Sequence, residues 1–149
     1  MDDLESIKQL KYRYLRALDT KDWDVFAETL TADVTGEYGS SLSFGNRAEL
    51  VEYMRSSVGP AVITEHRVAH PEIDVEGDSA TGRWYLQDRV IVPDFQFMLI
   101  GAAFYRDRYR RTEQGWRICA TGYDRTYEAK LSLADLPSFA LDVGPAIRM

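Results

Sequence analysis

Two ionisable side chains on predicted neighbouring strands have the types and spacing of an acid–base pair. Residues alternate between apolar and polar along segment 79–92, and Asp88 falls on the apolar face, where an unpaired carboxylate is costly. The same alternation in segment 62–75 turns His66 inward. Symmetric pairing about a turn at 76–78 sets His66 opposite Asp88. A carboxylate beside an imidazole orients the ring and tunes it as a general base, although such a pair can also simply tie two strands together.

The first predicted helix, residues 4–19, adds two more polar side chains. Tyr14 lies in the centre of its apolar stripe, so the hydroxyl enters the interior and needs a partner. Asp19 stands at the C-terminal end, where the helix dipole disfavours a carboxylate. It is a candidate acid, or else the N-cap of the next helix. Lys11 is expected outside the stripe with most of the basic residues of this helix.

The elements that must position these residues are three helices followed by long strands. The helices are expected at 4–19, from a cap at Thr20 or Asp22 to about Leu30, and from a cap at Asn46 to about Ser57. A short strand at 34–38 precedes the loop GSSLSFGN, and strand-like segments follow at 62–75, 79–92, 97–112 and 115–128. This order indicates a single α+β domain over 1–149, with helices on one face of a curved sheet and an irregular tail from Ala129.

The inner face of the sheet is expected to leave room for a cavity. Its members are predicted to be Trp84, Leu86, Gly101, Ala103, Tyr105, Ala120 and Gly122. Four of these are small, which suits a cavity, although a close approach of the first helix would also explain them. Aromatic residues form 12% of the chain and can either line a cavity or fill a core. His70 precedes Pro71, where the strand is expected to bend or bulge, and is predicted to be structural.

The outer face of the sheet is expected to meet solvent and a second copy of the chain. Arginines alternate along it, which is typical of a solvated face. Apolar residues among them indicate self-association in a dimer or trimer. The two sets are Arg106, Arg108 and Arg110, and Tyr85, Ile91, Phe104 and Tyr123.

Composition excludes several classes of protein. The 149 residues carry a formal net charge of −6, the wrong sign for binding nucleic acid or an anionic membrane. Cys119 is the only cysteine, so no disulfide framework or Cys-rich metal site is expected. The N-terminus MDDLESIKQL lacks the features of a signal peptide, and no apolar run is long enough to span a bilayer. A cytoplasmic protein is expected.

Several segments resemble the SnoaL-like branch of the NTF2-like superfamily. They are DTKDWD, TEH, ATGRWYLQD and GWRICATGYDRTYE, in an order that covers nearly the whole chain. The resemblance implies a cone-shaped α+β barrel, with three helices packed on a curved, mostly antiparallel sheet around a hydrophobic pocket. Members such as scytalone dehydratase, bile acid 7α-dehydratase and ketosteroid isomerase act on apolar substrates without metals or organic cofactors, and other members are non-catalytic.

The resemblance also implies roles for individual residues. The match to scytalone dehydratase holds at its catalytic aspartate and histidine but fails at other polar positions. The match to bile acid 7α-dehydratase is fuller, with the second aspartate partnering the histidine. It covers Tyr14, Asp19, His66 and Asp88, and a late-strand arginine that corresponds to Arg125.

Together these features predict a cofactor-independent lyase (dehydratase) or isomerase for a hydrophobic, polycyclic or steroid-like, oxygenated small molecule. His66, held by Asp88, would remove a proton from carbon beside a carbonyl. Tyr14 would hydrogen-bond the carbonyl oxygen, and Asp19 would assist proton delivery. The pocket is expected to include Trp84, Leu86, Ala103, Tyr105 and Arg125.

Two other functions stay open. The same pocket could serve a ligand-binding or accessory protein without chemistry. Epoxide hydrolysis needs an Asp–Arg–Asp set that activates water. It is the weaker alternative, because Asp88 and Arg89 are adjacent strand residues that face opposite sides and so match this set poorly.

Overall fold

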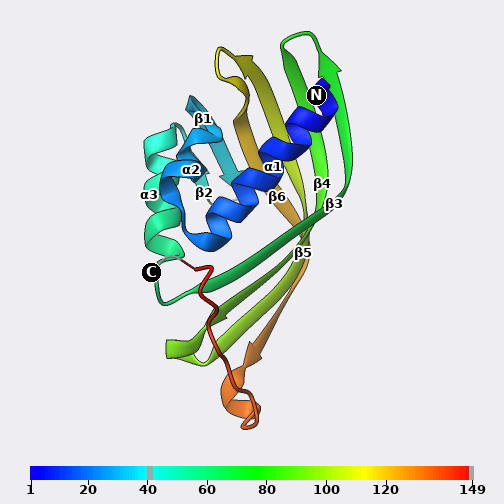
Figure 1. The fold of residues 1–149 in the computed structure, drawn as a ribbon. Coiled ribbons are helices and arrows are strands. Elements are labelled where there is room, and N and C mark those ends of the chain that lie inside the picture. Colours follow the sequence, from blue (N-terminus) through cyan, green and yellow to red (C-terminus); the bar gives the residue numbers. More distant parts are fainter. Residues whose placement is uncertain (40–41, 148–149) are drawn as a thin grey trace.

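Helices cover one face of a single mixed sheet in the computed structural model, which describes residues 1–39 and 42–147 (Figure 1). The helices are α1 (Asp3–Thr20), α2 (Trp23–Glu28) and α3 (Arg47–Ser57). The strands are β1 (Leu30–Tyr38), β2 (Leu42–Phe44), β3 (Ile63–Glu76), β4 (Ser79–Val92), β5 (Phe97–Thr112) and β6 (Gly115–Ser132). Their order in the sheet is β2-β1-β6-β5-β4-β3, antiparallel throughout except for the parallel pair β1–β6. None of the described helices is long and apolar enough to cross a membrane.

Side-chain caps fix where the three helices begin. The carboxylate of Asp2 accepts a hydrogen bond from the backbone N–H of Glu5 at 2.8 Å, and Asn46 caps α3 in the same way. Asp22 caps α2, which decides between the two candidates there and leaves Asp19 free for another role. The predicted second helix was too long, because the chain turns into β1 at Leu30.

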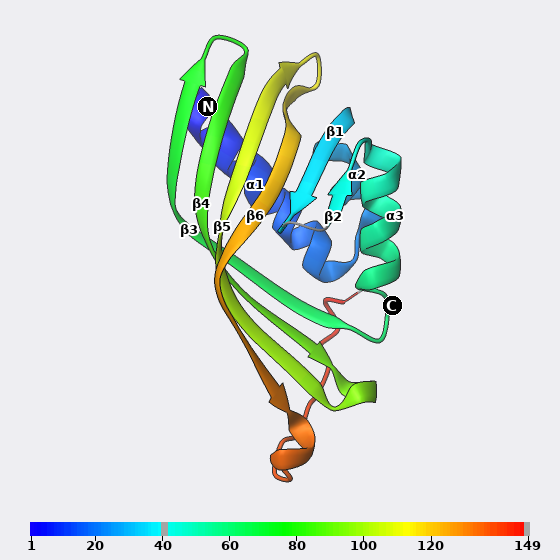
Figure 2. The same ribbon diagram turned by 180° about the vertical axis from the view of Figure 1, so that it is seen from behind.

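The sheet is longer and more open than the sequence predicted. The strand β1 begins before residue 34, and β2 lies within the segment expected as a loop, two of whose residues, 40 and 41, are outside the described part of the chain. The strand β6 continues to Ser132, so the strand ends four residues later than predicted. The sheet curves around the helices without closing, so the expected barrel is an open cone (Figure 2).

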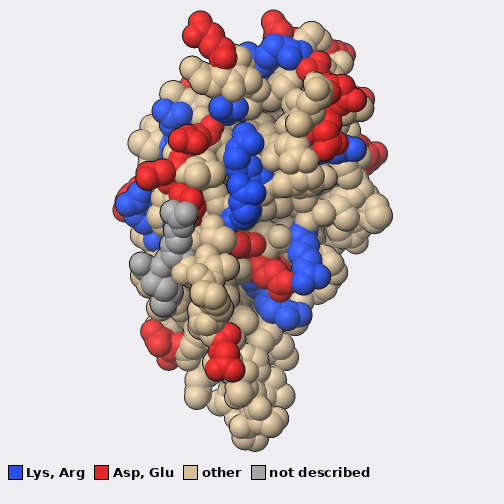
Figure 3. Space-filling view, viewed as in Figure 1, with Lys and Arg blue, Asp and Glu red and all other residues tan. Residues whose placement is uncertain are grey.

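The far ends of β4, β5 and β6 extend beyond the helices and carry few charged side chains (Figures 1 and 3). The short 3-10 turns η1 (Pro93–Phe95) and η2 (Leu133–Asp135) lie there, and the C-terminal segment runs from η2 back toward α3 (Figure 1). Exposed apolar residues mark this end of the molecule, namely Phe95, Leu131, Leu136, Phe139 and Leu141.

A bulge at His70 and Pro71 determines which residues of β3 face inward. Next to the turn, Glu76 pairs with Ser79, a register that by itself would set His66 opposite Arg89. The register shifts between Ala69 and Glu72, and His70 takes a positive φ of 51° there. Beyond the shift His66 pairs with Asp88, as predicted. One bulge residue therefore turns His66 inward instead of its neighbour, because a one-residue slip exchanges the two faces of a strand.

A second irregularity reverses a prediction on β6. The register shifts between Ile118 and Ala120, so the inward positions pass from even to odd residue numbers. Ala120 and Gly122, expected on the inner face, are replaced there by Thr121, Tyr123 and Arg125. Tyr123 therefore does not belong to the outer face.

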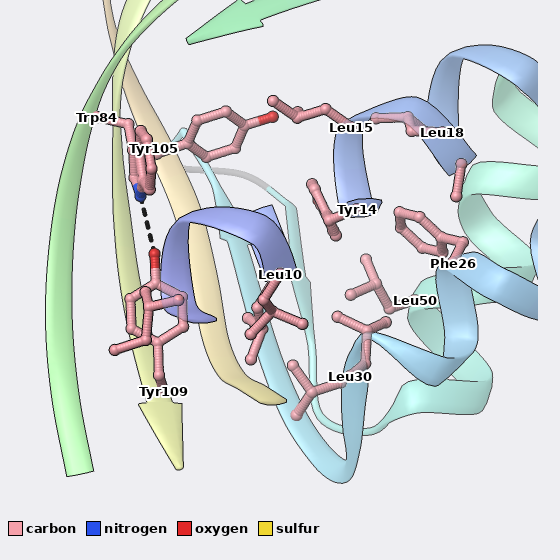
Figure 4. Packing of buried hydrophobic residues seen from close by; sticks show 14 of the residues in the cluster. Leu10, Tyr14, Leu15, Leu18, Phe26, Leu30, Leu50, Trp84, Tyr105 and Tyr109 are labelled. Carbon is pink, nitrogen blue, oxygen red and sulfur yellow. Dashed lines mark hydrogen bonds between the residues drawn. The ribbon is translucent and has the colours of Figure 1, made fainter. Parts of the chain in front are cut away.

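The core between α1 and the sheet is aromatic, and it contains a buried ion pair. The ring of Tyr105 packs edge-on against Tyr14, and Trp84 is the cross-strand neighbour of Tyr105. The indole N–H of Trp84 donates to the hydroxyl of Tyr109 at 2.8 Å (Figure 4). Beside them the side chain of Lys11, expected on the surface, is fully buried. Its counter-ion is Asp107, on the inner face of β5, 2.8 Å from the ammonium.

Candidate functional site

A cavity of about 140 Å³ lies between α1, α3 and the inner face of the sheet. It combines apolar side chains with an unusual number of phenols, and a small polar group stands at its wall. The phenols are Tyr14, Tyr38, Tyr53, Tyr105 and Tyr123. The polar group consists of Thr64, His66, Asp88 and Arg125. Such a concave, mostly apolar site with a few convergent polar groups is typical of small-molecule binding.

The imidazole of His66 is held by Asp19, at the end of α1. Its Nδ1 lies 2.7 Å from Oδ1 of Asp19, and its backbone N–H donates to Oδ2 at 2.8 Å. The hydroxyl of Thr64 donates to Asp19 Oδ1 at 2.8 Å. These donors offset the unfavourable position of a carboxylate at a helix C-terminus. In the neutral ring, Nδ1 then carries the proton and Nε2 is the basic nitrogen.

Asp88 is therefore the cross-strand neighbour of His66 but not its partner, which corrects the predicted pair. Its two carboxylate oxygens accept from the guanidinium of Arg125 at 2.8 and 2.7 Å. The pKa of Arg125 is raised, mainly by its hydrogen bonds to Asp88, so the guanidinium keeps its positive charge. The Nε of Arg125 also lies 3.0 Å from Glu128. An acid–arginine–acid set thus exists through Arg125, yet both Asp88 oxygens are directed at the guanidinium, so Asp88 is better suited to hold Arg125 than to activate water.

Gly101 provides the slot through which Arg125 crosses β5 to reach Asp88 on β4. A Cβ atom at this position would lie 2.1 Å from Nη1 of Arg125 and 3.0 Å from Oδ1 of Asp88. Gly101 was predicted to leave space for a ligand. The space is instead filled by the guanidinium, so this glycine shapes the cavity by admitting Arg125 to its wall.

Substitution of Gly101 by alanine should therefore displace Arg125 and leave the carboxylate of Asp88 buried without its partner. Because Arg125 is 20% exposed, we expect a loss of about 2 kcal/mol in the free energy of unfolding, measured by urea denaturation. The double variant G101A/R125M should be no less stable than R125M alone. Additive losses would show that the added methyl group acts elsewhere.

The phenols form a second polar wall of the cavity. The hydroxyls of Tyr14 and Tyr38 lie 3.2 Å apart, so one donates to the other. The hydroxyl of Tyr105 makes no hydrogen bond to any described residue, although the residue is only 1% exposed. Burial raises the pKa of all three phenols well above the ordinary value, so each keeps its proton at neutral pH. Together they can donate hydrogen bonds to an oxygen atom in the cavity.

A family model described as a SnoaL-like domain matches residues 1–121 of the chain. The protein belongs to the SnoaL-like family. An uncharacterized protein from Mycobacterium tuberculosis is 26% identical over 120 residues, which cover 79% of this chain and 82% of that protein.

Solved structures support the same fold for this SnoaL-like chain. A putative scytalone dehydratase from Novosphingobium aromaticivorans superposes with a TM-score of 0.79 at 16% identity, covering 85% of this chain and 86% of that one. A protein of unknown function with a cystatin-like fold, from Nostoc punctiforme, gives a TM-score of 0.67 at 20% identity, covering 83% and 90%. At these identities the likeness concerns the fold alone.

Within the SnoaL-like domain, the predicted site residues divide into wall and core. Tyr14, His66, Asp88, Tyr105 and Arg125 line the cavity as expected, and Asp19 contacts it through His66. Three predicted pocket residues lie instead in the packed core, namely Trp84, Leu86 and Ala103. Three further phenols that were not predicted for the pocket also line the cavity, namely Tyr38, Tyr53 and Tyr123. Tyr38 ends a predicted strand and Tyr53 lies in a predicted helix, but neither segment could be oriented toward the sheet without a three-dimensional structure.

Proposed function

We propose that this SnoaL-like protein is a lyase or isomerase that removes a proton from carbon next to a carbonyl group. The observation that supports it most is the 2.7 Å contact of His66 Nδ1 with Asp19 at the wall of a mostly apolar cavity. A carboxylate on Nδ1 fixes the ring and stabilises the imidazolium that forms when Nε2 takes a proton. Asp19 thus takes the orienting role that the sequence analysis gave to Asp88.

In the proposed reaction His66 both accepts the proton and returns it, so no second acid or base is needed. Nε2 accepts the α-proton, and the electron pair of the broken C–H bond forms an enolate whose oxygen accepts from Tyr14 or its neighbours. In an elimination the imidazolium returns this proton to the departing hydroxyl, and the electron pair forms the new carbon–carbon double bond. In an isomerisation it returns the proton to another carbon. Each such transfer typically contributes about 10²–10⁴ in rate.

The size of the cavity narrows the substrate that we propose. Its volume of about 140 Å³ resembles that of an engineered cavity of about 150 Å³ that binds benzene. One ring fits such a space, whereas a steroid needs several times more. The polar wall of the cavity is partly exposed, since Arg125 is 20% exposed, so we propose that the rest of a larger molecule projects outward past it. We therefore propose a cyclic ketone whose reacting ring alone is enclosed.

Exchange and elimination assays test this proposal. Cyclohexanone in D₂O reports proton abstraction through loss of its α-proton NMR signals, and 3-hydroxycyclohexanone reports elimination through enone absorbance. The His66→Gln variant serves as the blank, and a 3-oxo steroid tests the size limit. We expect exchange above the blank for the single-ring ketone. Ketones that bind to the wild-type protein but exchange no faster than with the blank would contradict the proposal and favour the binding or accessory role.

A further inference from the structure

We infer that Lys11 is a positioning residue of the site. Its buried ammonium strengthens the hydrogen bonds that the tyrosine wall (Tyr14, Tyr38 and Tyr105) donates to a ligand with an anionic oxygen, an enolate or a phenolate. The inference rests on the proposed function, and it adds that the site favours a bound molecule with negative charge on its oxygen. Lys11 does not line the cavity. It acts through the phenols that do.

The ion pair behind the tyrosine wall has a fixed direction. The side chains of Lys11 and Asp107 are both fully buried, with Nζ 2.8 Å from Oδ2. Two further donors hold the carboxylate, the hydroxyl of Tyr109 at 2.8 Å and that of Thr121 at 2.7 Å. The hydroxyl of Tyr109 in turn accepts from the indole of Trp84 (Figure 4). The negative end is thus held by three donors, the ammonium of Lys11 and the hydroxyls of Tyr109 and Thr121.

The positive end of the pair lies against two rings of the cavity wall. Nζ of Lys11 is 3.4 Å from the ring centroid of Tyr105 and 4.6 Å from that of Tyr14. A cation on the face of a phenol attracts its π electrons and makes its O–H a stronger donor. In a buried site with little water to screen it, the ammonium also attracts an anion on the far side of the ring.

The donors that this cation strengthens are available to a ligand. In the Tyr14–Tyr38 pair one hydroxyl uses its proton within the pair, so the other proton is free. Tyr105 is almost completely buried, lines the cavity and makes no hydrogen bond through its hydroxyl within the described chain. Its hydroxyl oxygen is not fully buried, so it can donate to a ligand oxygen in the cavity. The guanidinium of Arg125 also lines the cavity, but it is already neutralised by Asp88.

The competing explanation is that Lys11 and Asp107 only tie α1 to the sheet. The two explanations differ in what the pair does to charged and neutral ligands of the same shape. An electrostatic role favours an anionic oxygen selectively, whereas a purely structural role affects both ligands alike or neither.

Binding of 4-nitrophenolate and 4-nitroanisole separates these explanations. Both are single-ring probes, and calorimetric titration is performed at a pH above the pKa of the phenol. The K11M/D107N variant removes both charges and leaves neutral side chains of similar size. We expect it to lose about tenfold in affinity for the phenolate and to bind the anisole within about twofold of the wild-type protein. Equal changes for both probes, no change, or no measurable phenolate binding to the wild-type protein would overturn the inference.

A second variant keeps the test informative if the double variant does not fold. Y105F retains the ion pair and removes only the hydroxyl in contact with the cavity. It should also lose affinity for the phenolate selectively, and an unchanged phenolate affinity would contradict the inference. Neither assay involves proton transfer. If His66 proves inactive in the exchange experiment, the proposed function fails, and the phenolate preference remains to be judged on its own.

Discussion

Replacing Asp19 by asparagine should lower turnover of the cyclic ketone about 10³–10⁴-fold while the fold remains intact. The carboxylate accepts from Nδ1 of His66 and so leaves Nε2 unprotonated. An asparagine amide can donate its own N–H to Nδ1, which moves the ring proton to Nε2. The nitrogen at the substrate then lacks the lone pair that accepts the α-proton. The backbone N–H of His66, which bonds to the other carboxylate oxygen, can still donate to the amide oxygen. The hydroxyl of Thr64 shares its acceptor oxygen with Nδ1, so in the variant it would accept from the amide NH2 instead.

Steady-state kinetics with the best ketone of the exchange assay measures this effect. The loss should fall on kcat, with KM changed only slightly, because the tautomer affects proton transfer and not the shape of the cavity. Thr64→Val is the matched control, since it removes one donor to Asp19 without exchanging the tautomer, and it should lose less than about tenfold. A D19N variant with wild-type kcat would show that Nδ1 does not determine the reaction.

Strand alternation was enough to predict that His66 and Asp88 are neighbours, but only because two errors cancelled. The turn at Gly77 pairs residues whose numbers sum to 155, one more than assumed. The bulge at His70 places one extra residue in β3, so the sum falls to 154 beyond it and the predicted pairing is restored. The X-Pro step was recognised as a place for a bulge, yet periodicity alone cannot say whether a bulge adds a residue or only bends the strand.

The partners of the charged side chains could not be predicted, because they depend on rotamers and on layers that a single strand does not specify. Register places Asp88 beside His66, but the longer Arg125 reaches it from two strands away through the gap at Gly101. Asp19 reaches His66 from a helix whose distance from the sheet no sequence pattern gives. His66 and Asp88 are neighbours on adjacent strands, but each is paired with a residue outside their hairpin.

The buried ion pair was not predicted, for a different reason. Lys11 was assigned to the surface because it is charged, although its position on the helix faces the core. Lys11 is four residues from Ile7 and three from Tyr14, both in the apolar stripe, so its position predicts burial. Asp107 continues the inward run of Tyr105 on β5. Lys11 was expected outside because charged residues are seldom buried alone, and Asp107 was assigned to neither face. Two opposite charges at inward positions on facing elements are the signal that could have predicted their pairing.

Replacing Lys11 by methionine should lower the free energy of unfolding by about 3–5 kcal/mol, the typical loss when one partner of a buried ion pair is removed. The side chain of Asp107 is fully buried, so its carboxylate would keep only the hydroxyls of Tyr109 and Thr121 as donors. Burial lowers the pKa of Lys11 more than its attraction to Asp107 raises it, so desolvation outweighs the attraction within the pair. Removal of Lys11 alone would leave Asp107 with its own desolvation penalty and no counter-ion. Urea denaturation measures the loss, and thermal unfolding should show a melting temperature about 10 °C lower.

The double variant separates the attraction within this pair from the burial of its charges. In K11M/D107N no charge remains to be desolvated, so most of the loss should be recovered and the coupling energy should be large and favourable. A single variant that loses less than about 1 kcal/mol would mean that water or another cation reaches Asp107, contrary to its complete burial. If the double variant equals the wild-type protein in stability, the pair contributes nothing net to folding. Its presence behind Tyr105 and Tyr14 would then be explained by the ligand that those two phenols bind, and not by the core that they fill.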